Sequence, residues 1–148
     1  MSVKTRLKDD MKQAMRSGDK ARLGVIRMAL AAIQQREVDE RTELDDSAVL
    51  GVIEKMIKQR RESVEQYRSG AREDLAAREA AEIDVLLAYL PEPLEEAELA
   101  TMIEAAIAET GATSMKDMGR VMAQLRGQVQ GRADMAVLSA TVKAKLGS

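Results

Sequence analysis

Apolar residues recur every three or four positions along almost the whole chain, and no segment alternates cleanly between apolar and polar residues. The three-to-four spacing predicts α-helices, whereas strict alternation would predict strands. The pattern therefore predicts an all-α fold whose helices are separated by glycines, prolines and short polar runs.

Four helices are predicted in the first part of the chain. The first covers about residues 3–16. Gly18 ends it, because glycine tolerates the left-handed conformation that closes many helices, and Asp19 is a suitable N-cap for the second helix. The polar run at 39–43 predicts the loop that follows the second helix.

A long third helix is predicted, with Asp46 or Ser47 as its N-cap. We expect Ser69-Gly70 to end it, again because glycine accepts the left-handed conformation. The fourth helix is predicted to stop at Pro-Glu-Pro, residues 91–93, since two prolines remove backbone donors and bias the preceding residues to extended conformations.

The two prolines also mark the predicted domain boundary. Residues 1–92 are expected to form an N-terminal helical domain of about four helices, and residues 93–148 a small C-terminal three-helix bundle, the tail. The predicted end and cap signals of the tail helices are Gly111, the possible capping box of Ser114 with Asp117, Gly131, and Asp134.

The chain lacks most of the side chains that enzymes commonly use for catalysis. The 148-residue chain contains no histidine, cysteine, tryptophan or phenylalanine, so it lacks the imidazole base, the thiol nucleophile and the ligands that zinc prefers. No glycine-rich phosphate loop or calcium loop occurs. We therefore expect no catalytic residue, no metal site and no cofactor, and we predict a binding protein in place of an autonomous enzyme.

The charge and the leader region bear on partners and location. The net charge is −2, which argues against a strongly basic nucleic-acid clamp, and we expect no DNA partner. No apolar run is long enough to span a bilayer, so no membrane partner is expected. The charged N-terminus lacks a signal-peptide pattern, and the absence of cysteine means that no oxidising compartment is needed. These features predict a cytoplasmic location.

Three charged residues fall within apolar stripes. Arg60 lies in the stripe of the third helix and Glu79 in that of the fourth, so an antiparallel hairpin places Arg60 opposite Glu79 or Glu82. A partly buried arginine needs a carboxylate partner. The sequence predicts an ion pair that fixes helix register, and acid–base work by paired carboxylates is the alternative. Glu37 occupies a similar position on the second helix.

Basic side chains suggest two regions for contact with RNA phosphates, because the planar arginine fork binds phosphate oxygens in pairs. The candidates in the tail are Arg120, Arg126, Arg132, Lys143 and Lys145. The candidates near the third helix are Lys58, Arg61 and Arg72. An ordinary solvated surface is the alternative, since Glu54 precedes Lys58 by four residues and helices commonly carry such pairs. Around Gly131, backbone amides at a helix start also attract phosphate.

An ordered set of short motifs covers nearly the whole chain. The set comprises residues 58–63 (Lys-Gln-Arg-Arg-Glu-Ser), Gly70-Ala71-Arg72, Leu75-Ala76, Glu79, Glu82-Ile83, Tyr89-Leu90-Pro91, residues 117–122 (Asp-Met-Gly-Arg-Val-Met), residues 131–134 (Gly-Arg-Ala-Asp), Ser139, Val142-Lys143 and Leu146. In order and spacing the chain resembles the YqeY-like family, whose members are similar to the tail region of the GatB subunit of glutamine-dependent tRNA amidotransferase. One departure is Met135-Ala136, where the family commonly has a glycine-containing turn.

The resemblance implies a helical N-terminal domain and a three-helix tail that helps to hold tRNA. It therefore predicts a non-catalytic tRNA-associated accessory protein that acts on tRNA or a tRNA-processing complex. The family label of carbon–nitrogen ligase with glutamine as amido-N-donor is a further alternative. A protein-interaction module is another, suggested by Met115, Met118 and Met122, because methionine suits adaptable docking surfaces.

Overall fold

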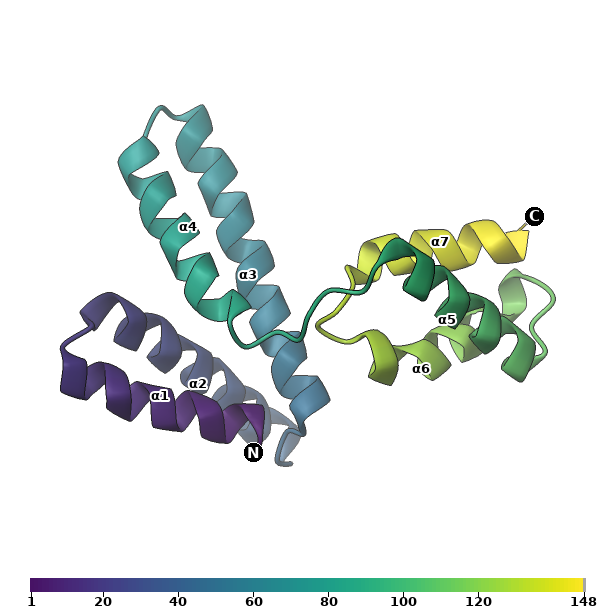
Figure 1. Ribbon diagram of the computed structural model, residues 1–148, viewed down its shortest axis with the longest axis horizontal. Helices are drawn as coiled ribbons and strands as arrows, with labels where there is room; N and C mark the ends of the chain where they lie inside the picture. The colour runs from purple at the N-terminus through teal and green to yellow at the C-terminus, as the bar shows by residue number, and fades with distance from the viewer. Residues whose placement is uncertain (148) are drawn as a thin grey trace. The chain divides into compact units, whose positions relative to one another are not determined.

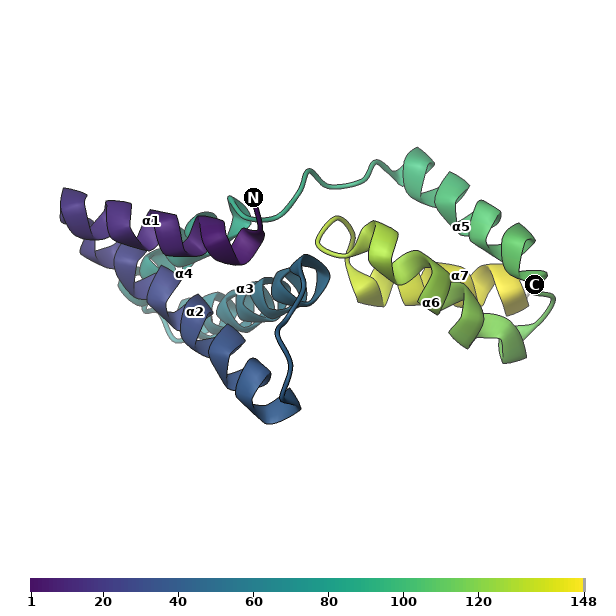
Figure 2. The same ribbon diagram turned by 90° about the horizontal axis from the view of Figure 1, so that it is seen from below.

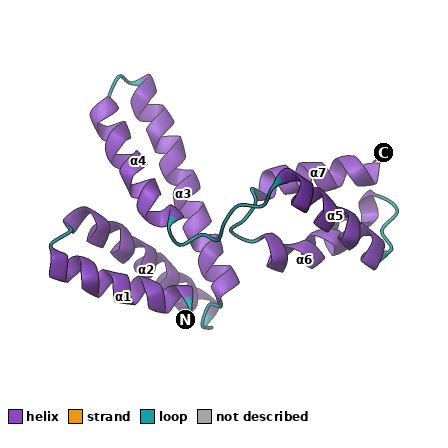
Figure 3. Cartoon of the chain, in the orientation of Figure 1, coloured by secondary structure: helices purple, strands orange, loops and turns teal. Residues whose placement is uncertain are grey.

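The computed structural model describes residues 1–147, which contain seven α-helices, one short 3-10 helix and no β-strand (Figure 3). This confirms the all-α prediction. Residues Met1–Leu90 form one compact unit, and the chain from Pro91 onward forms a second. That each unit folds as an independent domain stays a prediction.

The first unit consists of two helical hairpins, α1–α2 and α3–α4 (Figure 1). The bounds of its helices are α1 Val3–Ser17, α2 Lys20–Glu40, α3 Asp46–Ser69 and α4 Glu73–Leu87. The helix α2 packs against both α3 and α4, and α1 also contacts α3. The core lies between the hairpins and is almost entirely aliphatic, including the fully buried Leu7, Ile26, Ile33, Ile53 and Leu86.

The turn between α1 and α2 has the predicted end and cap. Gly18 adopts the left-handed conformation with φ 71°, and its N–H bonds to carbonyls of the last turn of α1. The Asp19 carboxylate accepts a hydrogen bond of 3.1 Å from the Arg22 N–H at the start of α2. Both features satisfy backbone groups that a helix end leaves unpaired.

The cap of α3 differs from the prediction. Asp45 caps the helix by accepting a hydrogen bond of 2.9 Å from the Ala48 N–H, so the prediction of Asp46 or Ser47 is wrong. Asp46 Oδ1 instead accepts a hydrogen bond of 3.0 Å from the Val3 N–H and joins the starts of α1 and α3. Neighbouring residues 45–47 all have capping chemistry, and this tertiary bond decides between them.

The helix α3 ends at Ser69 with Gly70 as its C-cap, as predicted, but Gly70 does not adopt the left-handed conformation that was expected of it. Gly70 has φ −88°, and the left-handed residue is Ala71 with φ 59°. The N–H of Arg72 reaches back to the Tyr67 carbonyl at 2.8 Å, a bond that requires the left-handed turn one residue before Arg72. The backbone geometry of the hairpin thus imposes at an alanine the conformation that glycine would adopt more easily.

Two other helix ends shift from their predicted positions. The helix α2 continues to Glu40 and ends at Arg41, which has φ 54°, so the polar run at 39–43 is only partly loop. The helix α4 ends at Leu87, before the prolines, and Tyr89 N–H then bonds to the Leu86 carbonyl at 3.1 Å in a turn. Tyr89 is only 3% exposed, and its burial anchors this turn.

The second unit is built from three α-helices and one 3-10 turn. Their bounds are α5 Glu96–Thr110, η1 Met115–Asp117, α6 Met118–Val129 and α7 Met135–Gly147. Figure 2 shows α6 and α7 side by side, and α6 also packs on α5. The core residues that are fully buried include Ile103, Val121, Leu125, Leu138 and Val142.

The predicted signals act at the expected places in the second unit. Gly111 ends α5 with φ 67°, and Gly131 has φ 79°. Ser114 and Asp117 form the capping box, but it opens the 3-10 turn η1, so α6 begins only at Met118. The capping box therefore precedes a tight 3-10 turn and not the α-helix itself.

Candidate nucleic-acid interface

The Arg60 side chain lies between α3 and α4 and is only 8% exposed. Its Nε atom lies 3.2 Å from Glu82 Oε2 and 3.9 Å from Glu79 Oε2, and its Nη2 donates to the Met28 sulfur at 3.4 Å. The structure therefore brings the three predicted ion-pair residues together. A guanidinium does not deprotonate in proteins, so Arg60 keeps its positive charge beside the two carboxylates.

Glu37, the other carboxylate on an apolar face, pairs with a different helix. Its side chain contacts Lys4 Nζ on α1 at 2.9 Å and accepts a hydrogen bond of 2.9 Å from the Leu44 N–H. These hydrogen bonds, first that from Lys4, lower the pKa of Glu37 below its usual value. The residue therefore fixes α1 and the α2–α3 loop to α2.

The candidates near α3 differ in how they are engaged. Arg72, at the hairpin tip, donates from Nε and Nη2 to the Asp74 carboxylate at 3.1 Å, which lowers the pKa of Asp74. Lys58 and Arg61 are exposed on α3, and neither side chain forms a hydrogen bond or ion pair with another described residue. Of these three candidates, Lys58 and Arg61 are the ones open to a partner.

Arg120, at the start of α6, is held by its own unit. Its guanidinium bonds to the Asp117 carboxylate and, at 3.2 Å, to the carbonyl of Thr110 at the end of α5. Asp117 also accepts from the Thr113 N–H, and this bond, followed by that from Arg120, lowers the pKa of Asp117. Arg120 therefore fastens the α5–α6 connection.

Arg132 and Lys145 are also engaged. Arg132 Nε donates to the Glu92 carbonyl at 2.9 Å, while the Leu94 N–H donates to the Arg132 carbonyl at 2.9 Å. This reciprocal pair attaches the segment before α5 to the loop before α7. Lys145 on α7 lies 3.2 Å from Glu104 on α5. Both cations stabilise the tail internally.

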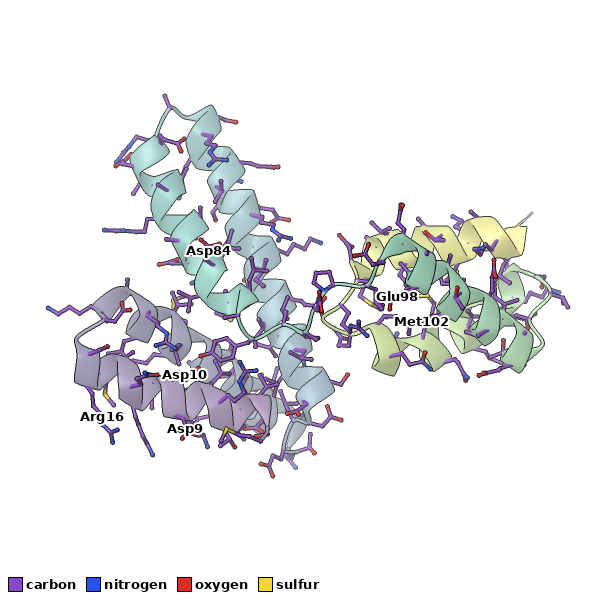
Figure 4. The ribbon with its side chains drawn as sticks, viewed as in Figure 1. Asp9, Asp10, Arg16, Asp84, Glu98 and Met102 are labelled. Atoms are coloured by element: carbon purple, nitrogen blue, oxygen red, sulfur yellow. The ribbon has the colours of Figure 1, made fainter. Side chains whose placement is uncertain are left out.

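Arg126 on α6 and Lys143 on α7 are exposed, and within the described residues neither side chain has a hydrogen-bond or ion-pair partner. The charges of the tail are also divided between its helices. Residues 116–147 carry six basic and two acidic side chains, whereas residues 91–110 carry six acidic and none basic. The exposed Glu98 of α5, labelled in Figure 4, belongs to the acidic part. The basic charge is thus concentrated in α6, α7 and the turns before them.

The turn at Gly131 does not present unpaired backbone N–H groups at the start of α7. At the start of α7, Asp134 Oδ1 accepts hydrogen bonds from the N–H groups of Ala136 at 2.8 Å and Val137 at 3.4 Å. The carboxylate of the chain itself therefore occupies the position where a phosphate would bind. The suggestion that amides near Gly131 attract phosphate is wrong for this structure.

The methionine stripe of the tail is mostly packed inside it. Met118 and Met122 lie partly buried against the tail core, and only Met115 is strongly exposed, at 40%. Most of the stripe is therefore core packing, which weakens its use as a docking surface.

Sequence reasoning missed a polar cluster around Tyr89. The Tyr89 hydroxyl donates to the carboxylate of Asp10 on α1, which is labelled in Figure 4, and Arg22 Nη2 lies 3.7 Å from the same carboxylate. The Arg6 guanidinium lies 5.2 Å from the centre of the Tyr89 ring. Burial and then the bond to Asp10 raise the pKa of Tyr89 to about 12. The motif Tyr89-Leu90-Pro91 was the only signal that pointed here.

No three acidic side chains among residues 1–147 are grouped so that they could hold a metal ion. None of the helices described combines the length and the apolar character that a membrane crossing requires.

Comparison with known proteins then decides the family. A sequence model described as "Yqey-like protein" matches residues 4–146. The chain belongs to the YqeY-like protein family. The resemblance seen in the motifs is therefore confirmed over nearly the whole length of the chain.

Several fungal relatives of this YqeY-like chain carry one name, "Altered inheritance of mitochondria protein 41, mitochondrial". The protein of Pyrenophora tritici-repentis is 35% identical over 133 residues, covering 88% of this chain and 73% of the relative. The proteins of Vanderwaltozyma polyspora and Eremothecium gossypii are 38% and 36% identical over 85 residues, covering 57% of this chain and 46% of each relative. The match thus spans about half the length of these two relatives.

The relatives correct the prediction of location. Their names describe mitochondrial proteins, which contradicts the expected cytoplasmic location. The prediction was wrong because it depended on missing cysteines and a missing secretory pattern. Those features argue only against an oxidising, secreted environment, and they do not distinguish between reducing compartments.

Proposed function

We propose that this YqeY-like chain is a non-catalytic accessory protein that binds tRNA, alone or within a tRNA-processing complex. The charge division of the tail is the observation that carries the proposal, because six basic side chains against two acidic ones lie in α6, α7 and their turns. Phosphate contacts supply most of the sequence-independent affinity for nucleic acid, so a basic surface of this kind is a suitable interface. The motif resemblance to the tail region of the amidotransferase subunit supports the same function.

Whether each basic side chain already has a partner within the chain decides which of them we propose as phosphate contacts. Arg126 and Lys143 are the primary contacts in the proposal, because both are exposed and have no partner among the described residues. Lys58 and Arg61 form the second pair for the same reason. Arg72, Arg120, Arg132 and Lys145 hold carboxylates or carbonyls of the chain, and we assign them structural roles.

The test is a gel-shift titration of the full chain with unmodified tRNA over a series of salt concentrations. Wild type is expected to bind at micromolar concentration in about 50 mM salt and to weaken steeply with added salt. The double variant Arg126→Glu/Lys143→Glu should lose binding. A second double variant, Arg126→Gln/Lys143→Gln, only neutralises the two charges and should lower the slope of log affinity against log salt by about two. Lys12→Glu/Arg16→Glu on α1 is the matched control with the same change of charge, since both residues are exposed.

Two results would contradict the proposal. One is the absence of any tRNA retention by wild type under these conditions. The other is equal weakening by the tail and control variants, because that would show only a response to net charge. Competition by a DNA duplex of similar length measures whether the interface prefers RNA, and far-ultraviolet circular dichroism verifies that each variant is folded.

A further inference from the structure

A groove of about 580 Å³ lies between α2 and α4 in the first unit. Most of its exposed lining surface is apolar. The uncharged lining residues are Ala21, Gly24, Val25, Met28, Ala81 and Val85, and the charged ones are Asp19, Lys20, Arg22, Arg78 and Glu82. Met28 is 54% exposed, so its side chain contributes apolar surface to the groove. The groove therefore presents apolar surface that the fold itself leaves uncovered.

The lining residues repeat at helical spacing. Ala21, Gly24 and Met28 follow at steps of three and four along α2, and Ala81 and Val85 do so along α4. The seven steps from Ala21 to Met28 extend over roughly 10 Å, or about two turns of helix. The groove thus has the length and periodicity that a third helix would match.

Gly24 makes one wall of the groove unusually low. It lies inside α2, where glycine is unfavourable by about 0.5–1 kcal/mol relative to alanine. A Cβ atom added at Gly24 would meet no other atom within 4 Å, so no contact within the chain requires glycine there. Together with Ala21 and Ala81, it leaves room for another backbone to approach closely.

The charges at the groove are unbalanced. The acidic lining residues are engaged, because Asp19 caps α2 and Glu82 accepts a hydrogen bond from Arg60. Lys20 and Arg78 also line the groove, and neither forms a side-chain hydrogen bond or ion pair within residues 1–147. The charges left for a partner are therefore positive and lie beside an apolar floor.

We propose that this groove binds an amphipathic helix of a partner protein. The helix would present small apolar residues to Gly24 and Ala81 and acidic residues to Lys20 and Arg78. This is the helix-in-groove mode, in which an apolar stripe gives the affinity and flanking charges give orientation. RNA fits this surface less well, because its phosphates would lie over apolar residues.

The test uses two synthetic helical peptides that share one stripe of leucine and alanine. Glutamates flank the stripe in the first peptide, and lysines flank it in the second. Fluorescence anisotropy of the labelled peptides with the full chain should show micromolar binding of the acidic peptide, tighter by roughly tenfold than that of the basic peptide. Arg78→Glu should remove this preference.

The variant Gly24→Leu fills the groove without disturbing the fold, since the position is open and leucine favours helix. It should weaken binding of the acidic peptide by at least roughly tenfold, because it removes the space for close approach. Gly127→Leu on α6 is the matched control, as a Cβ there also meets no atom within 4 Å, and binding should stay unchanged. Thermal denaturation should show that neither variant is destabilised.

Three outcomes would overturn the proposal. The first is no binding of the acidic peptide to wild type, and the second is binding that Gly24→Leu leaves unchanged. The third is failure of the peptide together with binding of phosphatidylglycerol vesicles that Gly24→Leu abolishes, which would assign the groove to lipid. Loss of tRNA binding has no bearing on these measurements, because Arg126 and Lys143 lie outside the groove.

Discussion

Removal of both carboxylates that face Arg60 should destabilise the first unit by more than the sum of the two single removals. Arg60 Nε bonds to Glu82 at 3.2 Å, and Glu79 lies at 3.9 Å as a second partner. Each carboxylate therefore compensates for the loss of the other. Only the variant Glu79→Gln/Glu82→Gln leaves the guanidinium, whose side chain is 9% exposed, without a carboxylate.

The magnitude follows from the burial of the three side chains. Loss of one partner of a fully buried pair costs about 3–5 kcal/mol, but Glu79 and Glu82 are 23% and 27% exposed, so water screens part of the charge. We expect about 1 kcal/mol for Glu82→Gln, less for Glu79→Gln, and about 3 kcal/mol for the double variant. Adding Arg60→Met should recover about 1–2 kcal/mol, since it removes the unpaired charge.

The assay is urea denaturation followed by tyrosine fluorescence and near-ultraviolet circular dichroism. The chain has only two aromatic residues, Tyr67 and Tyr89, and both lie in the first unit, so these signals report the unit that contains the ion pair. The matched control is Glu40→Gln, which breaks the Arg36–Glu40 pair on α2. Those side chains are 45% and 47% exposed, and the variant should shift the midpoint only slightly.

Additive single effects in the Glu79→Gln/Glu82→Gln cycle would refute the shared-partner argument. So would a double variant no less stable than Glu40→Gln, since Arg60 would then be solvated well enough to need no carboxylate. A failure of Arg60→Met to stabilise the double variant would show that the cost comes from lost packing and not from an unpaired charge.

Two predictions concern pH. The pKa of Tyr89 rises from 10 to about 12 on folding, so its contribution to stability is complete below pH 10 and should be lost between pH 10 and about 12. Tyr89→Phe should reduce this loss of stability at alkaline pH. In a Tyr67→Phe background, tyrosinate absorbance should show the raised pKa of Tyr89, and titration of Tyr89 near 10 would contradict the assignment. The pKa of Glu37 is lowered from 4.5, chiefly by the hydrogen bond from Lys4, so its contribution is present above pH 4.5 and should be lost as the pH falls further. Glu37→Gln should reduce the acid sensitivity of urea midpoints, and an unchanged profile would count against the Lys4 pairing.

The fold was largely predictable because its signals are local. The endings at Gly18 and Gly111, and the cap at Asp19, depend on residues within one turn of helix. The position of Arg60 opposite Glu79 and Glu82 follows from helical periodicity across one hairpin. These features require no knowledge of how distant segments pack.

The errors arose where a distant contact decides between similar residues. Asp46 had the chemistry of a cap, but its carboxylate binds the Val3 N–H, and Asp45 caps in its place. The turn at Ala71 takes its shape from a bond between Arg72 and Tyr67, which periodicity does not show.

The same limit applies to the candidate interface. Periodicity predicted which cations lie on helices, but it does not reveal that Arg132 holds the Glu92 carbonyl or that Arg120 holds the end of α5. The groove beside Gly24 was also not predicted, since its walls come from α2 and α4, which are far apart in the sequence. The positions of the charged residues on helices could therefore be predicted, but tertiary contacts determine which of them are free.

The separation of charge within the second unit has a mechanical consequence. With acids on α5 and bases on α6 and α7, the unit experiences a torque in the field of any polyanion, because one helix is repelled while the other two are attracted. Rotation toward the productive face would begin before contact, at distances up to a Debye length of about 8 Å in physiological salt. The small net charge of the chain does not reveal this polarity, because a net charge adds positive and negative residues without regard to where they lie.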